Sequence, residues 1–141
     1  MDESLIALDI DISSKQCVIE KIADLLEGSG RLTDREKYIQ DVLVREKIIS
    51  TYIGDGMVIP HARTDAVNAA SLVYLRLNEP VTWNDSEDAK YVFGIAVPEE
   101  NVDNVFLEIL STVARKLLDE TIKSVIFNAA SKKDILVALL N

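Results

Sequence analysis

Residues 91–97, Tyr-Val-Phe-Gly-Ile-Ala-Val, form a near-continuous apolar run that ends at Pro98. A strand that is apolar on both sides must be covered on both faces, as central strands are in sheets flanked by helices. This run therefore predicts a central strand in a sheet that carries helices on each side.

Strand-like and helical patterns are interleaved around this run. Apolar residues alternate over residues 6–12, which predicts a half-buried strand. Apolar residues then recur at helical spacing in two segments, after capping-box patterns at Ser13 and at Thr33, which predicts two helices. The second helix is expected to bury Ile49. Further segments are expected to be strands at 57–59, 68–77 and 90–97, and helices that begin near Asn101, Asp119 and Ser131. The order β-α-α-β-β-β-α-α-α predicts a mixed α/β (α+β) fold with one sheet of about four to five strands and helices on its faces.

Composition narrows the class of protein. The 141 residues predict one domain, and the net charge of −9 argues against nucleic acid or an anionic membrane as the main partner. No apolar stretch approaches the roughly 20 residues of a membrane helix, and the N-terminus does not resemble a signal peptide, so we expect a cytoplasmic protein without direct membrane insertion. With one histidine, one cysteine and no acidic loop, we expect neither a metal nor a cofactor.

The segment Gly54-Asp-Gly-Met-Val-Ile-Pro60-His61 contains the only histidine of the chain. The glycines favour a tight turn, residues 57–59 a short buried strand, and Pro60 the end of that strand. The pattern predicts an imidazole presented at a strand's end, where its neutral form can act as a nucleophile. A lone histidine is also common as a surface residue or as a hydrogen-bonded core residue, and spacing alone does not separate these alternatives.

The pattern Gly54-x-Gly56-x-x-Ile59-Pro60-His61-Ala62 resembles the phosphorylation-site motif of the mannitol/fructose-type enzyme IIA domains. These domains belong to the bacterial phosphoenolpyruvate:sugar phosphotransferase system. The length, the order of elements and the tail Ser131-Lys-Lys-Asp134-Ile-Leu are similar across nearly the whole chain, which implies a single enzyme IIA-like (type 2) domain over residues 1–141.

The resemblance implies that His61 accepts a phosphoryl group from phospho-HPr, a small carrier protein. It then implies transfer to a cysteine of enzyme IIB, with uptake and phosphorylation of a sugar through the membrane enzyme IIC. The alternative is a regulatory domain of the same fold, which binds partners according to its phosphorylation state and has no direct role in transport.

The family also has an arginine sixteen residues before the active histidine, which is Arg45 here. A guanidinium presents a planar fork that fits phosphoryl oxygens, so the resemblance implies that Arg45 stabilises the phosphorylated histidine. From the residues alone, Arg45 is more simply a solvated helix charge paired with Asp41. Arg63 is a further candidate, because it points to the same side as His61 if the strand continues.

One position departs from the family. Many members carry a second histidine in the helix after the long central strand, and Phe106 occupies that place. A phenyl ring cannot donate a hydrogen bond to a phosphoryl oxygen. Either Arg45, backbone amides and a polar neighbour such as Asn104 suffice, or the site is slower or reshaped. Phe106 could also cover the imidazole and exclude water, or could be ordinary helix packing.

Overall fold

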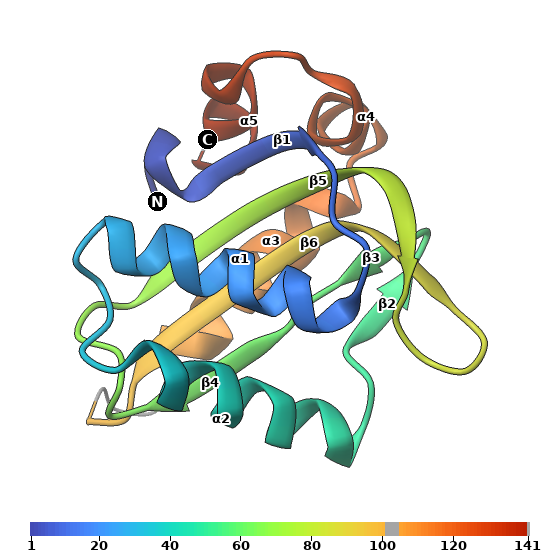
Figure 1. Cartoon of the computed structure of the whole chain (residues 1–141). Helices are drawn as coiled ribbons and strands as arrows, with labels where there is room; N and C mark the ends of the chain where they lie inside the picture. Colours follow the sequence, from blue (N-terminus) through green and yellow to red (C-terminus); the bar gives the residue numbers. More distant parts are fainter. Residues whose placement is uncertain (101–104, 141) are drawn as a thin grey trace.

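A computed structural model of the chain describes residues 1–100 and 105–140, which form a mixed sheet with helices on both faces (Figure 1). This confirms the predicted fold class. The first half contains the 3-10 helix η1 (Glu3–Leu5), β1 (Ile6–Ile10), α1 (Lys15–Gly28), α2 (Arg35–Ile48), β2 (Tyr52–Gly54), β3 (Met57–Val58) and β4 (His61–Thr64). The second half contains β5 (Ser71–Thr82), β6 (Asp88–Pro98), α3 (Val105–Leu117), α4 (Glu120–Asn128) and α5 (Lys132–Leu140).

The described sheet has six strands in the order β1-β5-β6-β3-β2, with β4 also pairing with β6. β5 and β6 are antiparallel, whereas β3 and β4 both run parallel to β6. The number exceeds the four to five strands expected, because the glycine turn folds residues 52–54 back as β2 and because residues 61–64 form β4, beyond the strand expected at 57–59.

β3 ends at Val58, before Pro60, as the sequence predicts, but a second strand that also pairs with β6, β4, begins directly after the proline. The carbonyl oxygen of Pro60 accepts the N–H of Ile95 at 3.0 Å, so the backbone stays beside β6. Pairing resumes at once, with His61 opposite Ile95 and Ala62 opposite Ala96. Proline lacks an N–H but keeps a carbonyl oxygen, and this acceptor is sufficient to hold the segment between β3 and β4 against β6.

Helices α1 and α2 cover the face of the sheet turned toward the viewer in Figure 1, and α3 lies behind it. Residues 92–97 of β6 are buried on both sides, since Val92 and Ala96 belong to the core under α1 and α2 while Phe93, Ile95 and Val97 belong to the opposite core. The buried hydroxyl of Tyr38 in α2 donates to the carbonyl oxygen of Ile95 at 3.2 Å. These contacts hold α2 beside β4 and so place one wall of the site described below.

Several local expectations are corrected by the structure. The N-caps of α1 and α2 are Ser14 and Asp34, one residue later than predicted, because these side chains accept the N–H groups of the first turns. Ile49 follows the end of α2 and is 64% exposed instead of buried. Ile6 and Ala7 of β1 are both buried, since helices pack on both faces there, and the expected cap at Asn101 lies outside the described residues. Within the described ranges, no helix has the length and apolar character needed to cross a bilayer.

Candidate functional site

The glycine turn predicted from the sequence brings His61 to the edge of β6. Gly54, Asp55 and Gly56 all have positive φ, at 109°, 52° and 78°. Such angles strain most L-residues, which explains glycine at two of the three positions. The turn joins β2 to β3, β3 lies beside β6, and after Pro60 the start of β4 leaves the side chain of His61 half-buried at the surface.

The imidazole of His61 is oriented by one short hydrogen bond. Its Nδ1 lies 2.7 Å from the carbonyl oxygen of Ile59. A carbonyl oxygen can only accept, so the neutral ring carries its proton on Nδ1 and keeps the lone pair on Nε2. The ring is therefore neither sealed in the core nor committed at both nitrogens to partners that the structure describes.

The surroundings favour the neutral, nucleophilic form of this ring. Burial is the largest influence, and it lowers the pKa of His61. The hydrogen bond to Ile59 acts in the opposite direction, the positive charge of Arg45 lowers the pKa further, and the negative charge of Glu46 raises it. The net result is a pKa below the ordinary value of 6.5, so the ring is mostly neutral at pH 7.

His61 lines a pocket of about 560 Å³ between α2, β4 and the start of α3. The same pocket is lined by Arg45 from α2, Arg63 from β4 and Phe106 from α3, so these predicted site residues come together although they are far apart in the sequence. Asn104 lies outside the described residues. Among residues 1–100 and 105–140, no three His, Cys, Asp or Glu side chains are grouped in a way that could hold a metal ion.

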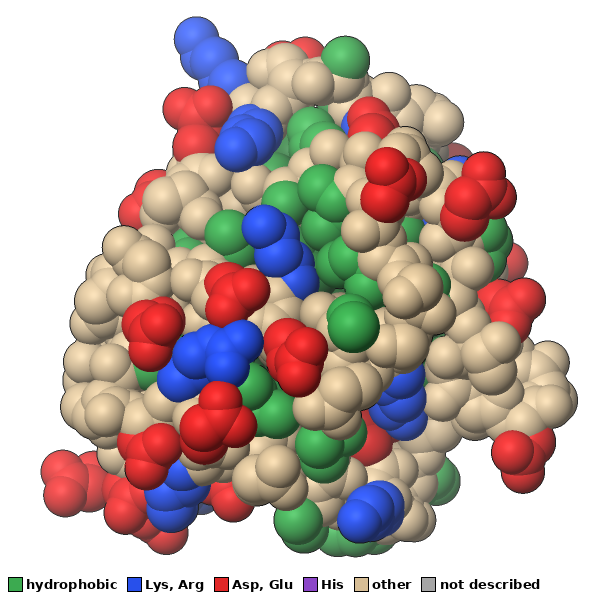
Figure 2. Space-filling view, viewed as in Figure 1, with side chains coloured by type: hydrophobic (Ala, Val, Ile, Leu, Met, Phe, Trp, Pro, Cys, Tyr) green, Lys and Arg blue, Asp and Glu red, His purple; other side chains and the backbone are tan. Residues whose placement is uncertain are grey.

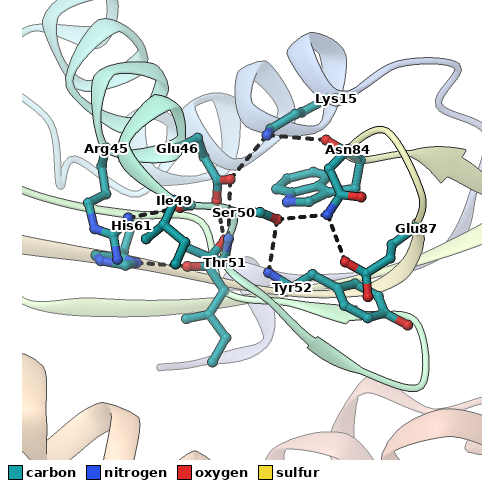
Figure 3. Close-up of polar contacts among 12 residues, drawn as sticks. Lys15, Arg45, Glu46, Ile49, Ser50, Thr51, Tyr52, His61, Asn84 and Glu87 are labelled. Carbon is teal, nitrogen blue, oxygen red and sulfur yellow. Dashed lines mark hydrogen bonds and ion pairs between the residues drawn. The ribbon is translucent and has the colours of Figure 1, made fainter.

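Arg45 is not paired with Asp41, which was the simpler interpretation of its charge. The carboxylate of Asp41 instead lies 3.4 Å from the Nζ of Lys37. Arg45 donates from one guanidinium nitrogen to the carbonyl oxygen of Ile49 at 3.0 Å, which orients the side chain (Figure 3). A guanidinium has five N–H donors, so the fork keeps donors for a phosphoryl group in the pocket.

The other two candidates have different surroundings. Arg63 is exposed and lies on the same side of β4 as His61, but its Nε and one terminal nitrogen donate to the carbonyl oxygen of Glu99, at 3.3 and 3.0 Å. The ring of Phe106 stacks on the imidazole, with centroids 4.6 Å apart and planes at 29°. Phe106 therefore contacts one face of the imidazole, which both sequence-based interpretations, a cover that excludes water and ordinary helix packing, predict.

Glu46, a buried carboxylate one residue after Arg45, is not predicted from the sequence. A glutamate in a helix is normally read as solvated, and no motif marks this one. A signal was nevertheless present, because Ile39, Val42 and Glu46 follow the helical spacing of one buried face.

Comparisons with known proteins identify the family. The profile of the family described as "Phosphoenolpyruvate-dependent sugar phosphotransferase system, EIIA 2" matches residues 1–141. The chain belongs to this enzyme IIA family. As such it is a phosphotransferase component, which transfers phosphoryl groups between proteins.

Relatives of this enzyme IIA chain occur as short proteins and as parts of longer ones. It is 34% identical over 133 residues to the "PTS system fructose-specific EIIA component" of Haloferax volcanii, with 93% of this chain and 86% of the relative covered. It is also 34% identical over 138 residues to the "PTS system fructose-specific EIIABC component" of Bacillus subtilis, covering 96% of this chain but only 21% of that protein. The crystal structure of the nitrogen regulatory protein IIA-Ntr from Neisseria meningitidis has a TM-score of 0.87 and 30% identity, and covers 98% of this chain and 94% of that one.

Proposed function

We propose that this enzyme IIA chain is a phosphocarrier that accepts a phosphoryl group from phospho-HPr on Nε2 of His61 and passes it to a cysteine of enzyme IIB. The observation that carries the proposal is the 2.7 Å hydrogen bond from Nδ1 to the Ile59 carbonyl oxygen, which leaves Nε2 as the nucleophile. The family match over the whole length also supports residues 1–141 as a single enzyme IIA-like (type 2) domain.

The transfer needs little beyond position and charge. The Nε2 lone pair attacks phosphorus as the donor's phosphorus–nitrogen bond breaks, and that electron pair stays on the donor. In the second step, a thiolate of enzyme IIB attacks the same phosphorus, and the electron pair returns to Nε2. The neutral ring favoured by burial is the form required for the first step.

Arg45 is the proposed stabiliser of the phosphoryl oxygens. Its guanidinium is permanently charged, lines the same pocket as His61 and is held by Ile49. Arg63 is a less direct candidate, because its guanidinium is already bound to the Glu99 carbonyl. Phe106 supplies no hydrogen bond, and its proposed role is to keep water from one face of the phosphorylated ring.

The surroundings of the pocket are suited to a protein partner. Val44, Ile48 and Leu107 line it and are 57%, 76% and 57% exposed. In Figure 2 apolar side chains are visible at the lower edge, where Figure 1 places the end of α2, and also over the upper centre of the face, with acidic and basic side chains mixed around them. HPr and enzyme IIB would contact this apolar rim in turn.

Enzyme IIB and, through it, the membrane enzyme IIC are the proposed onward partners. The Bacillus subtilis relative is named as an EIIABC component, so in that protein an A part belongs to the same polypeptide as B and C parts. A carrier that meets phospho-HPr would work in the cytoplasm.

A regulatory function is the second candidate, because the Neisseria meningitidis structure is titled a nitrogen regulatory protein IIA-Ntr. A regulator of this kind would also be phosphorylated on the histidine. It would then bind a partner according to that state, instead of passing the group to an enzyme IIB.

Reconstitution tests the proposal. The chain is incubated with phosphoenolpyruvate, enzyme I and HPr, and its intact mass is followed. We expect acid-labile phosphate on the wild type and none on His61→Gln, a variant that keeps a polar side chain but has no imidazole. Onward transfer to an enzyme IIB supports the carrier, and its absence with every enzyme IIB of the source organism supports the regulator. A wild type that stays unmodified contradicts both.

A further inference from the structure

We propose that Glu46 is a positioning residue for His61, which holds the backbone that fixes the imidazole with its lone pair on Nε2. The inference deepens the proposed function and rests on it for its catalytic meaning. Glu46 does not line the pocket, so it would act through the segment between α2 and β4.

The carboxylate of Glu46 is buried and surrounded by donors. Its side chain is only 2% exposed, and Lys15 Nζ donates to Oε2 at 3.0 Å. Thr51 donates twice, from its N–H to Oε2 at 3.3 Å and from its hydroxyl to Oε1. A buried carboxylate with all its donors in place is rigid, because each lost partner would leave a desolvated charge.

The contacts lead from Thr51 to the imidazole. The carbonyl oxygen of Thr51 accepts the N–H of Ile59 at 3.1 Å. The carbonyl oxygen of Ile59 in turn accepts Nδ1–H of His61 at 2.7 Å. Because Pro60 restricts Ile59 to extended backbone, holding the N–H of Ile59 also fixes the direction of its carbonyl.

The neighbouring residue holds the other end of the same segment. Arg45 donates to the carbonyl oxygen of Ile49, two residues before Thr51 (Figure 3). Arg45 and Glu46 are consecutive in α2 and both hold the segment 49–51. Arg45 binds the carbonyl of Ile49, and Glu46 binds Thr51. Glu46 thereby influences the orientation of His61, while Arg45 stays oriented in the pocket.

A purely structural role for Glu46 makes a different prediction. The ion pair with Lys15 joins α2 to the start of α1, and Lys15 also donates to the Trp83 carbonyl oxygen at 3.3 Å in the β5–β6 connection. If that junction were the whole role, losing Glu46 would lower stability and remove a charge that raises the pKa of His61, but it would leave the tautomer of the ring unchanged. If Glu46 positions His61, its loss should change which ring nitrogen carries the proton.

The test is the tautomer of His61, read from the imidazole ¹⁵N chemical shifts. The chain has one histidine, so the signals need no assignment. In Glu46→Gln we expect the fraction of ring protonated on Nε2 to rise several-fold, and phosphorylation by phospho-HPr to slow by about tenfold with little change in the apparent KM. Thr51→Val should move both readouts in the same direction, and Thr51→Ser, which restores the hydroxyl, should return them to wild type.

Asp9→Asn is the matched control. Asp9 is also a carboxylate paired with a buried cation, since its Oδ1 lies 2.8 Å from Nε of Arg76, but it is on β1 in another part of the sheet. We expect this variant to keep the wild-type tautomer and phosphorylation rate. The urea midpoint of every variant is recorded to follow its folding stability.

The proposal is overturned if folded Glu46→Gln keeps the wild-type tautomer, whether or not its rate falls. If Glu46→Gln does not fold, Thr51→Val and Thr51→Ser decide by the same readout. Failure of the proposed function is distinguishable, because it appears as a wild type that HPr does not phosphorylate, while the tautomer comparison needs no phosphate.

Discussion

Replacing Arg45 by Gln is the sharpest test of how the pocket handles a phosphoryl group. The change removes a permanent charge beside His61 and leaves a shorter, neutral polar side chain in its place. One guanidinium nitrogen of Arg45 is bound to the Ile49 carbonyl oxygen, so its other N–H groups are the donors that it can offer to a phosphoryl group. The fold should tolerate the change, because Ile49 is exposed and water can replace the lost donor.

The size of the effect follows from the contacts that would be lost. A hydrogen bond to a charged group contributes about 1.5–3 kcal/mol. If that contact is made in the transition state, its loss slows phosphoryl transfer by about 10- to 150-fold, since 1.36 kcal/mol corresponds to tenfold in rate. The pKa of His61 should rise at the same time, because the positive charge of Arg45 lowers it.

Two measurements on the same samples check this: rapid-quench phosphorylation by phospho-HPr, and a pH titration of the imidazole by NMR. Arg35→Gln is the control, because it makes the same charge change on the same helix, where Arg35 pairs with Asp24 and Glu36 outside the pocket. The phosphorylation rate of Arg63→Gln should lie between those of Arg45→Gln and Arg35→Gln. A wild-type rate for Arg45→Gln would remove Arg45 from the proposed mechanism, and an equal loss in Arg35→Gln would show a general effect of net charge.

Three further predictions concern the site and the packing beneath it. Phe106→Ala uncovers the imidazole, and a stacked pair contributes about 0.5–1.5 kcal/mol, so phosphohistidine should hydrolyse about two- to tenfold faster; an unchanged decay of acid-labile phosphate would contradict the covering role. Because burial lowers the pKa of His61, the midpoint of the decline in phosphorylation rate on acidification should lie below the ordinary imidazole value of 6.5; a midpoint at or above 6.5 would contradict this shift. Gly94→Ala would place a methyl group 2.8 Å from Cδ1 of Ile22, which should cost about 1–3 kcal/mol in urea unfolding, and Ile22→Ala in the same chain should recover part of that loss; full additivity would exclude the clash.

Local patterns in the sequence were sufficient for the fold class and for singling out His61 as the proposed nucleophile. The apolar run at 91–97 required cover on both faces, and the structure provides it with α1 and α2 on one side and the later helices on the other. The glycine turn was predictable because positive φ angles favour glycine. His61 could be singled out because it is the only histidine and follows this turn directly.

Other features depend on contacts between distant segments, which no local pattern records. The strand resumes after Pro60 because the β6 backbone lies beside it, and Phe106 stacks on His61 because α3 begins at the same pocket. The burial of Glu46 requires Lys15 and Thr51 to meet it, and the orientation of the imidazole depends on where the fold places the carbonyl of Ile59. The sequence by itself determined which groups are available for chemistry, since side-chain type sets nucleophilicity and charge. Only the tertiary structure decided which nitrogen is free and what surrounds it, because hydrogen-bond direction and burial arise from packing.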